Sequence, residues 1–367
     1  MAEIDSVVEE EVPIDFVITE IAPLNSSVDN RSRPPPPSAP AVDKACGSHS
    51  SKGEKSALPI SSSLSEAPDR FPFRRPWVGL VNLGNTCYAN SVLDCLFPFP
   101  ELWDFPACRP LHQAMRAILV IMNVQPRDPS KATPLRPKIF LEALARHIST
   151  LRKPPFCFNK QHDAAEVLGY VLNELFSAGV SRKLVCSSLM ISYCCQVCKT
   201  TKPAFNDAVE EPILHLKARR SLSVALRKRL LGGKVTVFCE TCNSDRECIE
   251  QSSFSHLPDI LIMRIRRDRF VKGKGACRVE RSVECDRHLS ISLQDGDEIS
   301  STKYHLIAVS HHLGQSLEKG HYTTTLIDPR RKKNSMWKYD DVSVSKARYL
   351  NERTAYVLFY RKEKGPG

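Results

Sequence analysis

Two pairs of cysteines, far apart in the chain, place the strongest constraint on how this sequence can fold. Cys195 and Cys198 form one Cys-x-x-Cys pair, Cys239 and Cys242 form another, and 40 residues separate the pairs. Each pair can grip a metal ion from a tight turn, and four thiolates make a closed tetrahedral zinc site. Such a site would tie two distant hairpins together. The alternative is that the four cysteines are free thiols at turns.

The surroundings of the cysteines indicate a structural zinc in an intracellular protein. Neither pair has the His and Glu partners or the open position of a catalytic zinc site. The chain holds 14 cysteines, which in a reducing compartment serve as metal ligands, nucleophile or buried thiols rather than disulfides. The acidic start of the chain lacks a secretory signal, and no apolar run approaches the roughly 18 residues of a membrane span. We therefore expect a cytoplasmic or nuclear protein without a membrane segment.

Composition divides the chain into a tail and a folded part. Residues 1–70 carry 12 acidic and 6 basic side chains, a net charge of −6, which leaves +17 on residues 71–367. The first part is rich in Ser and Pro and has few large apolar residues, so it cannot bury enough surface to offset its ordering entropy. We predict a disordered tail over 1–70. Its run of four prolines, 34–37, favours polyproline II, either as a spacer or as a ligand of an SH3 or WW domain.

Residues 71–367 change from helical to β patterns along the chain. Apolar residues at steps of three and four predict helices after Cys87, over 111–122, from Pro137 to Leu151, and after an Asn159 cap to about 176. Short β-favouring runs follow at 234–238, 257–265, 304–311, 322–327 and 354–360. Helices first and strands later predict an α+β protein with an antiparallel sheet.

Cys87 stands between an irregular loop and the first of these helices. Gly and Asn signals precede it, and Tyr88, Val92, Leu93 and Leu96 suit one face of a helix that Pro98 ends. The partial positive charge at a helix N-terminus favours a thiolate over a thiol. We therefore expect Cys87 to have a lowered pKa and to be the nucleophile of an acyl-transfer site.

A thiolate hydrolase also needs a base and a group that orients it. His321 enters a β-favouring run directly after Gly320, where a glycine permits close approach of the backbone to a substrate. Asp340 lies in a second strand-like run, 337–342, and pairing of the two runs would bring Asp340 beside His321. A histidine on a strand is often structural, but three coordinated residues favour catalysis.

At this point the chain resembles the ubiquitin-specific protease family. Residues 79–96 are similar to the family's cysteine box, GLxNLGNTCYxNSxLQxL, and residues 161–166 (QHDAAE) resemble its QQDAxEF motif. Residues 304–309, His312-x-Gly314, 320–322, 337–341 and 355–360 resemble its histidine box, and the two cysteine pairs fall where the family carries its zinc ribbon. The resemblance runs over about 77–362 in the family's order.

The resemblance implies a hand-shaped, papain-like cysteine protease with a helical thumb, a β-rich palm and zinc-ribbon fingers. The thumb would cover about 77–183, the fingers about 184–265 and the palm, with the histidine box, about 266–362. Two departures from the family pattern are places where substrate preference can shift. Lys319 replaces the first Gly of Gly-Gly-His, and Asp268 follows Arg267 where Phe is usual.

The resemblance also implies the role of each site residue. Cys87 would be the nucleophile, His321 the general base and acid, Asp340 the group that orients His321, and Asn82 the oxyanion donor beside the Cys87 N–H. Asp163 would hold the arginine-bearing tail of ubiquitin, and Gly320 and Tyr322 would line its channel. The implied activity is hydrolysis of the bond after the C-terminal glycine of ubiquitin, including isopeptide bonds to lysine, through a thioester.

Other functions remain open from the sequence alone. The enzyme would act on a different ubiquitin-like modifier if its channel accepts another tail, or the chain would be a catalytically weak scaffold that binds ubiquitin. A zinc-ribbon protein that binds nucleic acid would explain the basic runs 217–234 and 264–281, but it leaves Cys87 and His321 without a purpose. We therefore expect ubiquitin and ubiquitinated proteins as partners, and no nucleic acid.

Overall fold

The computed structural model describes residues 75–363, apart from 107, 126–131, 152, 154, 205–207, 273–274, 296–297, 315–318 and 331–335. The predicted tail over 1–70, with its proline run and the SH3 or WW partner that this run suggests, lies outside the described residues. No helix among the described residues is long and apolar enough to cross a membrane.

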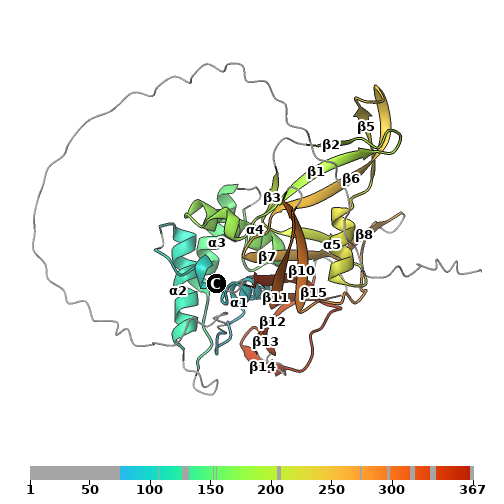
Figure 1. Ribbon diagram of the computed structural model, residues 1–367. Coiled ribbons are helices and arrows are strands. Elements are labelled where there is room, and N and C mark those ends of the chain that lie inside the picture. The colour runs from blue at the N-terminus through green and yellow to red at the C-terminus, as the bar shows by residue number, and fades with distance from the viewer. Residues whose placement is uncertain are drawn as a thin grey trace, which may run out of the picture. The chain divides into compact units, whose positions relative to one another are not determined.

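A group of four helices makes up the first part of the fold (Figure 1). They are α1 (Cys87–Leu96), α2 (Pro110–Val124), α3 (Lys138–Leu151) and α4 (Ala164–Ser177), with the short helices η1 (Pro100–Leu102) and η2 (Arg182–Leu184) beside them. The predicted apolar faces are buried, as Leu111, Met115 and Leu119 of α2 show. The cap predicted for α4 is wrong: the helix starts at Ala164, because Asp163 rather than Asn159 accepts the N–H of Ala165.

Helix α1 lies at the centre of this part of the molecule. All ten of its residues are buried, because α1 contacts α4 on one side and three strands on the other, β11 (Glu298–Leu313), β12 (His321–Ile327) and β13 (Met336–Asp340). Hydroxyl groups hold the sheet side: Ser91 Oγ lies 2.7 Å from Ser310 Oγ and 2.9 Å from Thr324 Oγ1. The helix that carries Cys87 is therefore fixed directly on the strand that begins with His321.

An eight-stranded sheet packs against the helices. Its strand order is β14-β13-β12-β11-β15-β7-β4, and β10 also pairs with β11. The strands are β4 (Leu214–Lys217), β7 (Ile260–Arg266), β10 (His288–Asp295), β11 (Glu298–Leu313), β12 (His321–Ile327), β13 (Met336–Asp340), β14 (Ser343–Ala347) and β15 (Ala355–Lys362). All its pairs are antiparallel except β4 with β7, so the expectation of an antiparallel sheet is wrong at that edge.

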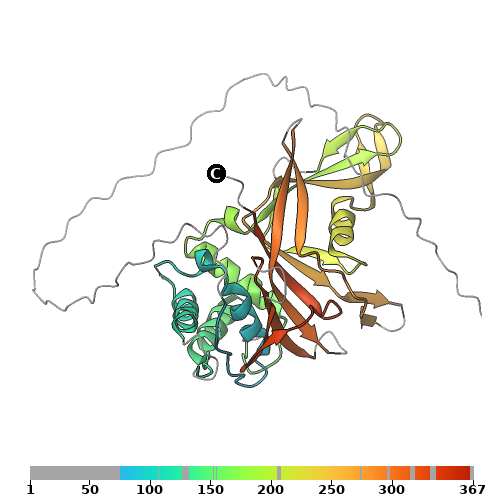
Figure 2. The same ribbon diagram turned by 60° about the horizontal axis from the view of Figure 1, so that its bottom comes forward.

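A five-stranded sheet projects from the eight-stranded one (Figure 2). It consists of β1 (Ser187–Cys195), β2 (Thr201–Pro203), β3 (Val209–Glu211), β5 (Lys234–Cys239) and β6 (Ser244–His256), and both cysteine pairs lie at its far end. Strands β8 (Asp268–Val271) and β9 (Gly275–Arg278) form a separate hairpin.

One helix was not predicted. Helix α5 (Leu222–Leu230) lies in the first basic run, where Ser221 caps it by accepting the N–H of Val224. Leu222, Ala225 and Leu226 are buried at helical spacing, but the charges around them hide this short pattern. The prediction of an α+β fold is confirmed, because helices and sheets occupy successive parts of the chain.

Candidate active site and metal centre

The loop before α1 delivers Cys87 to the first position of the helix. Asn82 Oδ1 accepts the N–H groups of Gly84 (3.1 Å) and Thr86 (3.0 Å), which closes a tight turn. Gly84 and Asn85 have φ values of 95° and 58°, a left-handed conformation that glycine and asparagine tolerate best. This turn aims the first helical N–H groups at the Cys87 side chain.

The ionisation of Cys87 differs from the expectation. Its side chain is only 4% exposed, and this burial raises the pKa of the Cys87 thiol above its ordinary value. Backbone N–H groups, foremost that of Tyr322, act in the opposite direction, while the charge of Asp341 adds to the rise. The predicted lowering of the Cys87 pKa is wrong for the free protein, because desolvation of the thiol outweighs the effect of the helix N-terminus.

His321 and Asp340 meet across two neighbouring strands. His321 begins β12, Asp340 ends β13, and the antiparallel register of these strands brings the two side chains together. His321 Nε2 lies 2.6 Å from Asp340 Oδ1, so its N–H donates there and leaves Nδ1 for another partner. Burial opposes ionisation of Asp340, but hydrogen bonds from Lys338 and His321 bring the pKa of Asp340 below its usual value.

Asp341 connects the loop of Asn82 to helix α1. One of its oxygens accepts Asn82 Nδ2–H at 2.9 Å and the other accepts Asn90 Nδ2–H at 2.8 Å. The Asn82 amide keeps a second N–H for another acceptor. Asp341, at φ 52°, also accepts the backbone N–H of Leu80 through its carbonyl. The sequence prediction missed this residue, although a second carboxylate directly after Asp340 was a signal for it.

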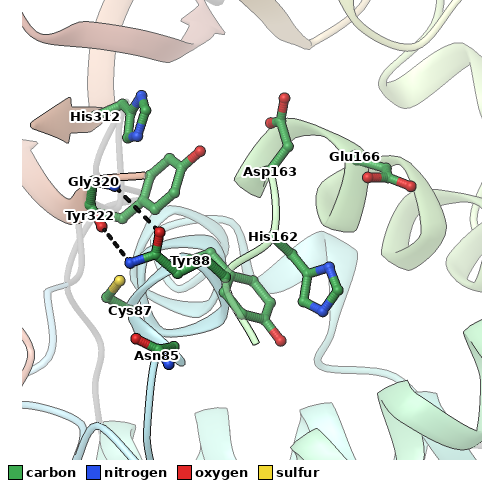
Figure 3. Close-up of a pocket in the computed structure, with 10 residues that line it drawn as sticks. Asn85, Cys87, Tyr88, His162, Asp163, Glu166, His312, Gly320 and Tyr322 are labelled. Carbon is green, nitrogen blue, oxygen red and sulfur yellow. Dashed lines mark hydrogen bonds between the residues drawn. The ribbon is translucent and has the colours of Figure 1, made fainter. Parts of the chain in front are cut away.

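A cleft of about 260 Å³ runs past Cys87 (Figure 3). Its walls come from the α1 loop, the start of α4 and the segment before β12: Asn85, Cys87, Tyr88, Gln161, His162, Asp163, Glu166, His312, Gly320 and Tyr322. The predicted residues Gly320, Tyr322 and Asp163 therefore share one cleft with Cys87. Two hydrogen bonds cross it, from Gln161 Nε2 to Gly320 O (3.2 Å) and from Gly320 N to Gln161 Oε1 (3.3 Å). Gln161 was not predicted as a site residue.

The backbone at Gly320 has no room for a side chain. A Cβ atom there would lie 2.4 Å from both His312 Nε2 and Leu313 O. His312 stacks on Tyr322 with ring centroids 4.6 Å apart, so the wall of the cleft is packed behind Gly320. The structure thus requires glycine at the position where the sequence predicted close approach to a substrate.

Asp163 lies in the cleft but its carboxylate is already engaged. Oδ1 accepts the N–H of Ala165 (2.7 Å), and Oδ2 accepts Arg264 Nη2–H (2.8 Å) and the Tyr356 hydroxyl (2.6 Å). Asp163 thereby joins the start of α4 to strands β7 and β15. The sequence motif did not predict Arg264 or Tyr356 as partners of this acid.

The four paired cysteines meet at the end of the five-stranded sheet. Their sulfur atoms all lie within 4.8 Å of one another, with Cys195–Cys242 at 4.0 Å and Cys198–Cys239 at 3.5 Å. Tetrahedral coordination with Zn–S bonds of about 2.3 Å needs sulfurs about 3.8 Å apart, so the cluster fits a metal ion. Lys199 (φ 62°) and Asn243 (φ 49°) give both pairs a tight left-handed turn directly after their second cysteine.

Comparisons with known proteins find similarity over most of the chain. A family model described as ubiquitin carboxyl-terminal hydrolase matches residues 78–360. Ubiquitin carboxyl-terminal hydrolase Usp2 of Drosophila melanogaster is 25% identical over 92% of this chain, and ubiquitin carboxyl-terminal hydrolase 42 of Homo sapiens is 26% identical over 92%. The matches cover 42% and 26% of those two relatives, so the chain spans less than half of their length.

A third relative and two solved structures extend the comparison. Probable ubiquitin carboxyl-terminal hydrolase 16 of Schizosaccharomyces pombe is 26% identical over 78% of this chain and 66% of its own length. The fold is similar to that of a chain in the SAGA Ubp8/Sgf11/Sus1/Sgf73 DUB module bound to ubiquitin aldehyde. The TM-score is 0.66 at 18% identity, over 82% of this chain and 72% of that one. The same module with a cysteine-to-alanine variant of Ubp8, bound to monoubiquitin, gives a TM-score of 0.64 at 18% identity, over 83% and 72%.

Proposed function

The chain belongs to the ubiquitin carboxyl-terminal hydrolase family, and from this premise we propose that it is a cysteine-type deubiquitinase. It hydrolyses the bond after the C-terminal glycine of ubiquitin, including isopeptide bonds to lysine in conjugates or chains. One observation carries the proposal: Cys87 lies in a cleft beside Tyr322, whose neighbour His321 is already oriented by Asp340. Ubiquitin and ubiquitinated proteins are the partners that this activity requires.

In the proposed reaction, the Cys87 sulfur attacks the carbonyl carbon of the terminal glycine. His321 accepts the thiol proton through Nδ1 and then gives it to the leaving amine as the C–N bond breaks. The resulting thioester is hydrolysed by water that His321 deprotonates, which frees Cys87. Asp340 stabilises the imidazolium through its 2.6 Å hydrogen bond. The raised pKa of the Cys87 thiol makes this proton transfer a necessary first step.

Asn82 and the backbone N–H of Cys87 are the proposed oxyanion donors. The Asn82 amide is held by Asp341 and by the turn that it closes, so its remaining N–H needs no reorganisation when charge develops on the carbonyl oxygen. Gly320 and Tyr322 line the channel that receives the C-terminal glycines. Asp163 receives the basic tail that precedes them.

We further propose that Cys195, Cys198, Cys239 and Cys242 hold a structural zinc ion. Their geometry supports this, since the sulfur distances match a tetrahedral S4 site and no group at the cluster is suited to catalysis among the residues that the structure describes. The bound metal would supply a cross-link between β1 and the β5–β6 hairpin. We assign α1 to α4 to a thumb (about 77–183), the five-stranded sheet to fingers (within about 184–265) and the eight-stranded sheet to a palm (about 266–362), to which β4 and β7 add two strands from the range 184–265.

A covalent probe tests the proposed function. Ubiquitin that carries a thiol-reactive group at its C-terminus should form an adduct with the wild-type chain at Cys87, and Cys87→Ala should form none. Cys157→Ala is the matched control, because it removes an exposed thiol and should leave the adduct unchanged. Mass spectrometry of the tryptic peptides identifies the modified residue.

Two outcomes would contradict the proposal. A folded, reduced wild-type chain that forms no adduct with ubiquitin would exclude the deubiquitinase. If equivalent probes built on another ubiquitin-like modifier react instead, the alternative of a protease for that modifier is correct. Binding of ubiquitin without any adduct identifies the scaffold.

A further inference from the structure

The carboxylate of Asp163 has no free side for a new bidentate partner. Its Oδ1 is taken by the Ala165 N–H and its Oδ2 by Arg264 and Tyr356. An incoming guanidinium makes its strongest pair with a carboxylate when it reaches both oxygens. A cationic tail residue therefore meets an acid that a cation of the chain itself already neutralises.

The hydrogen-bond donors of Arg264 are only partly satisfied in its pair with Asp163. The ion pair with Asp163 is partly open to water, with side chains 25% and 33% exposed. Arg264 Nε is buried without a hydrogen-bond partner in the part of the chain that the structure describes, and the guanidinium lies 5.2 Å from the Tyr356 ring. An arginine with one unsatisfied donor gives up less hydrogen-bond energy when it leaves.

There is also a place for Arg264 to move. A cavity of about 60 Å³ lies beside it, and its wall contains Asp163, Arg264 and Asp268. Arg267 and Arg278 also line it, but their guanidinium groups are bonded to backbone carbonyls. Asp268 is bonded to Arg266 (2.6 Å), and a carboxylate accepts more than one such bond. Asp268 therefore offers Arg264 a second anionic partner in the wall of the same cavity.

We propose that Arg264 is a displaceable counter-ion of Asp163 that sets how strongly the cleft selects for positive charge in the substrate tail. A tail arginine gains its pair with Asp163 only by moving Arg264 away, so one guanidinium replaces another. The net gain from positive charge in the tail is then small, and the cleft accepts neutral tails almost as well. This inference rests on the proposed function, because it takes Asp163 as the contact for the tail.

The test compares two substrates in each of four proteins. The substrates are fluorogenic ubiquitin and the same ubiquitin with its tail arginines replaced by glutamine. The proteins are the wild type, Arg264→Ala, Arg264→Gln and Lys217→Ala. Arg264→Gln keeps most of the side-chain volume if Arg264→Ala folds poorly. Lys217→Ala is the matched control, because it removes an equal charge at an exposed position of β4, the strand paired with β7, outside the cavity that Asp163 and Asp268 line.

The expected result is a change in the preference for the arginine tail over the glutamine tail. Without Arg264 the preference for the arginine tail should rise about three- to tenfold over that of the wild type, as expected for a partly exposed ion pair. The change should appear in KM, with kcat nearly constant, and Lys217→Ala should keep the wild-type preference. A residue that only supports the fold would lower activity toward both substrates equally.

An unchanged or weaker preference for the arginine tail in the Arg264 variants would overturn the inference. An equal rise in Lys217→Ala would also overturn it, because the effect would then belong to net charge rather than to Arg264. If the wild type turns over neither substrate, the proposed function itself fails, which is a separate and recognisable outcome.

Discussion

Two opposing influences act on the thiol of Cys87 at the scale of the single residue. The first turn of α1 and the N–H of Tyr322 favour the thiolate, while burial disfavours it. Among the described residues, no hydrogen bond joins Cys87 to His321. Catalytic hydrogen bonds often tighten only when the substrate binds, so we expect the free protein to hold a neutral Cys87.

The pH dependence of alkylation tests this balance. Only the thiolate reacts with iodoacetamide, and a raised pKa places its formation at higher pH than for an ordinary cysteine. The rate at Cys87, followed by peptide mass spectrometry, should therefore still be rising through about pH 9 in the folded chain. The same cysteine in the urea-unfolded chain should titrate at lower pH. A rate already constant at about pH 7 would show a stable thiolate–imidazolium pair and contradict the expectation.

Removal of the amide of Asn82 tests the oxyanion site. Asn82→Ala should lower kcat for a ubiquitin substrate by about 10²- to 10³-fold with little change in KM, because the donor acts on the transition state. Asn82 also closes the loop before α1, so a control for loop damage is needed. Thr86→Val removes the hydroxyl that accepts the Leu83 N–H (2.9 Å) and donates to Asn82 Oδ1 (3.3 Å), but it leaves the proposed donor, the Asn82 N–H, in place.

The two variants separate the roles of Asn82. If Thr86→Val loses as much kcat as Asn82→Ala, the effect comes from the loop and not from oxyanion stabilisation. Circular dichroism and thermal unfolding of both variants establish that the chain remains folded.

At the scale of the element, the end of the five-stranded sheet depends on four sulfur atoms. Cys195 ends strand β1 and Cys198 lies in the turn after it, while the β5–β6 hairpin contributes Cys239 and Cys242. Little else is buried there: the cluster consists of cysteines with Tyr193, Val235 and Val237 partly buried against it. A cluster so small cannot supply the stability of a core, which supports the proposed metal ion as the source of order there.

Loss of the metal should therefore loosen this region alone. We expect about one zinc ion per chain, removed by a strong chelator and absent in Cys239→Ser. Hydrogen exchange should then accelerate in β5 and in the adjoining half of β6, and α1 should stay protected. Cys248→Ser is the matched control, because Cys248 is buried next to Cys195 in β6 but is outside the set of four. Zinc content unaffected by Cys239→Ser would rule out the proposed site.

The elements also show which local features can be read from sequence. The runs over 234–238 and 322–327 coincide with β5 and β12 to within a residue, and 354–360 coincides with β15 to within two, because β-branched and aromatic residues are frequent there. The run over 304–311 covers only the second part of β11, and the run over 257–265 starts three residues before β7. Helix α5 and the long strands β1 and β6 were missed, since their buried residues are few and separated by polar ones. The parallel pairing of β4 with β7 follows from tertiary packing and has no local signal.

At the scale of the whole molecule, the sequence indicates which strands lie next to each other at the site but not the electrostatic state of the residues there. The strand register that brings His321 to Asp340 could be expected from two β-favouring runs. The raised pKa of Cys87 could not, because burial depends on β11, β12 and β13 packing around α1. Arg264 at Asp163, and Asp341 between Asn82 and Asn90, are contacts between segments more than 100 residues apart.

The span of the Asp341 contacts has a consequence for the newly made protein. Asp341 lies 259 positions after Asn82 and 251 after Asn90, and the strands that carry His321 and Asp340, β12 and β13, join the rest of the sheet through β11. A ribosome that has released only the helices holds a chain with a cysteine but no base and no fixed amide. The proposed hydrolytic activity then cannot begin before β12 and β13 have been synthesised. The proposed active site is complete only after these two strands have paired beside α1.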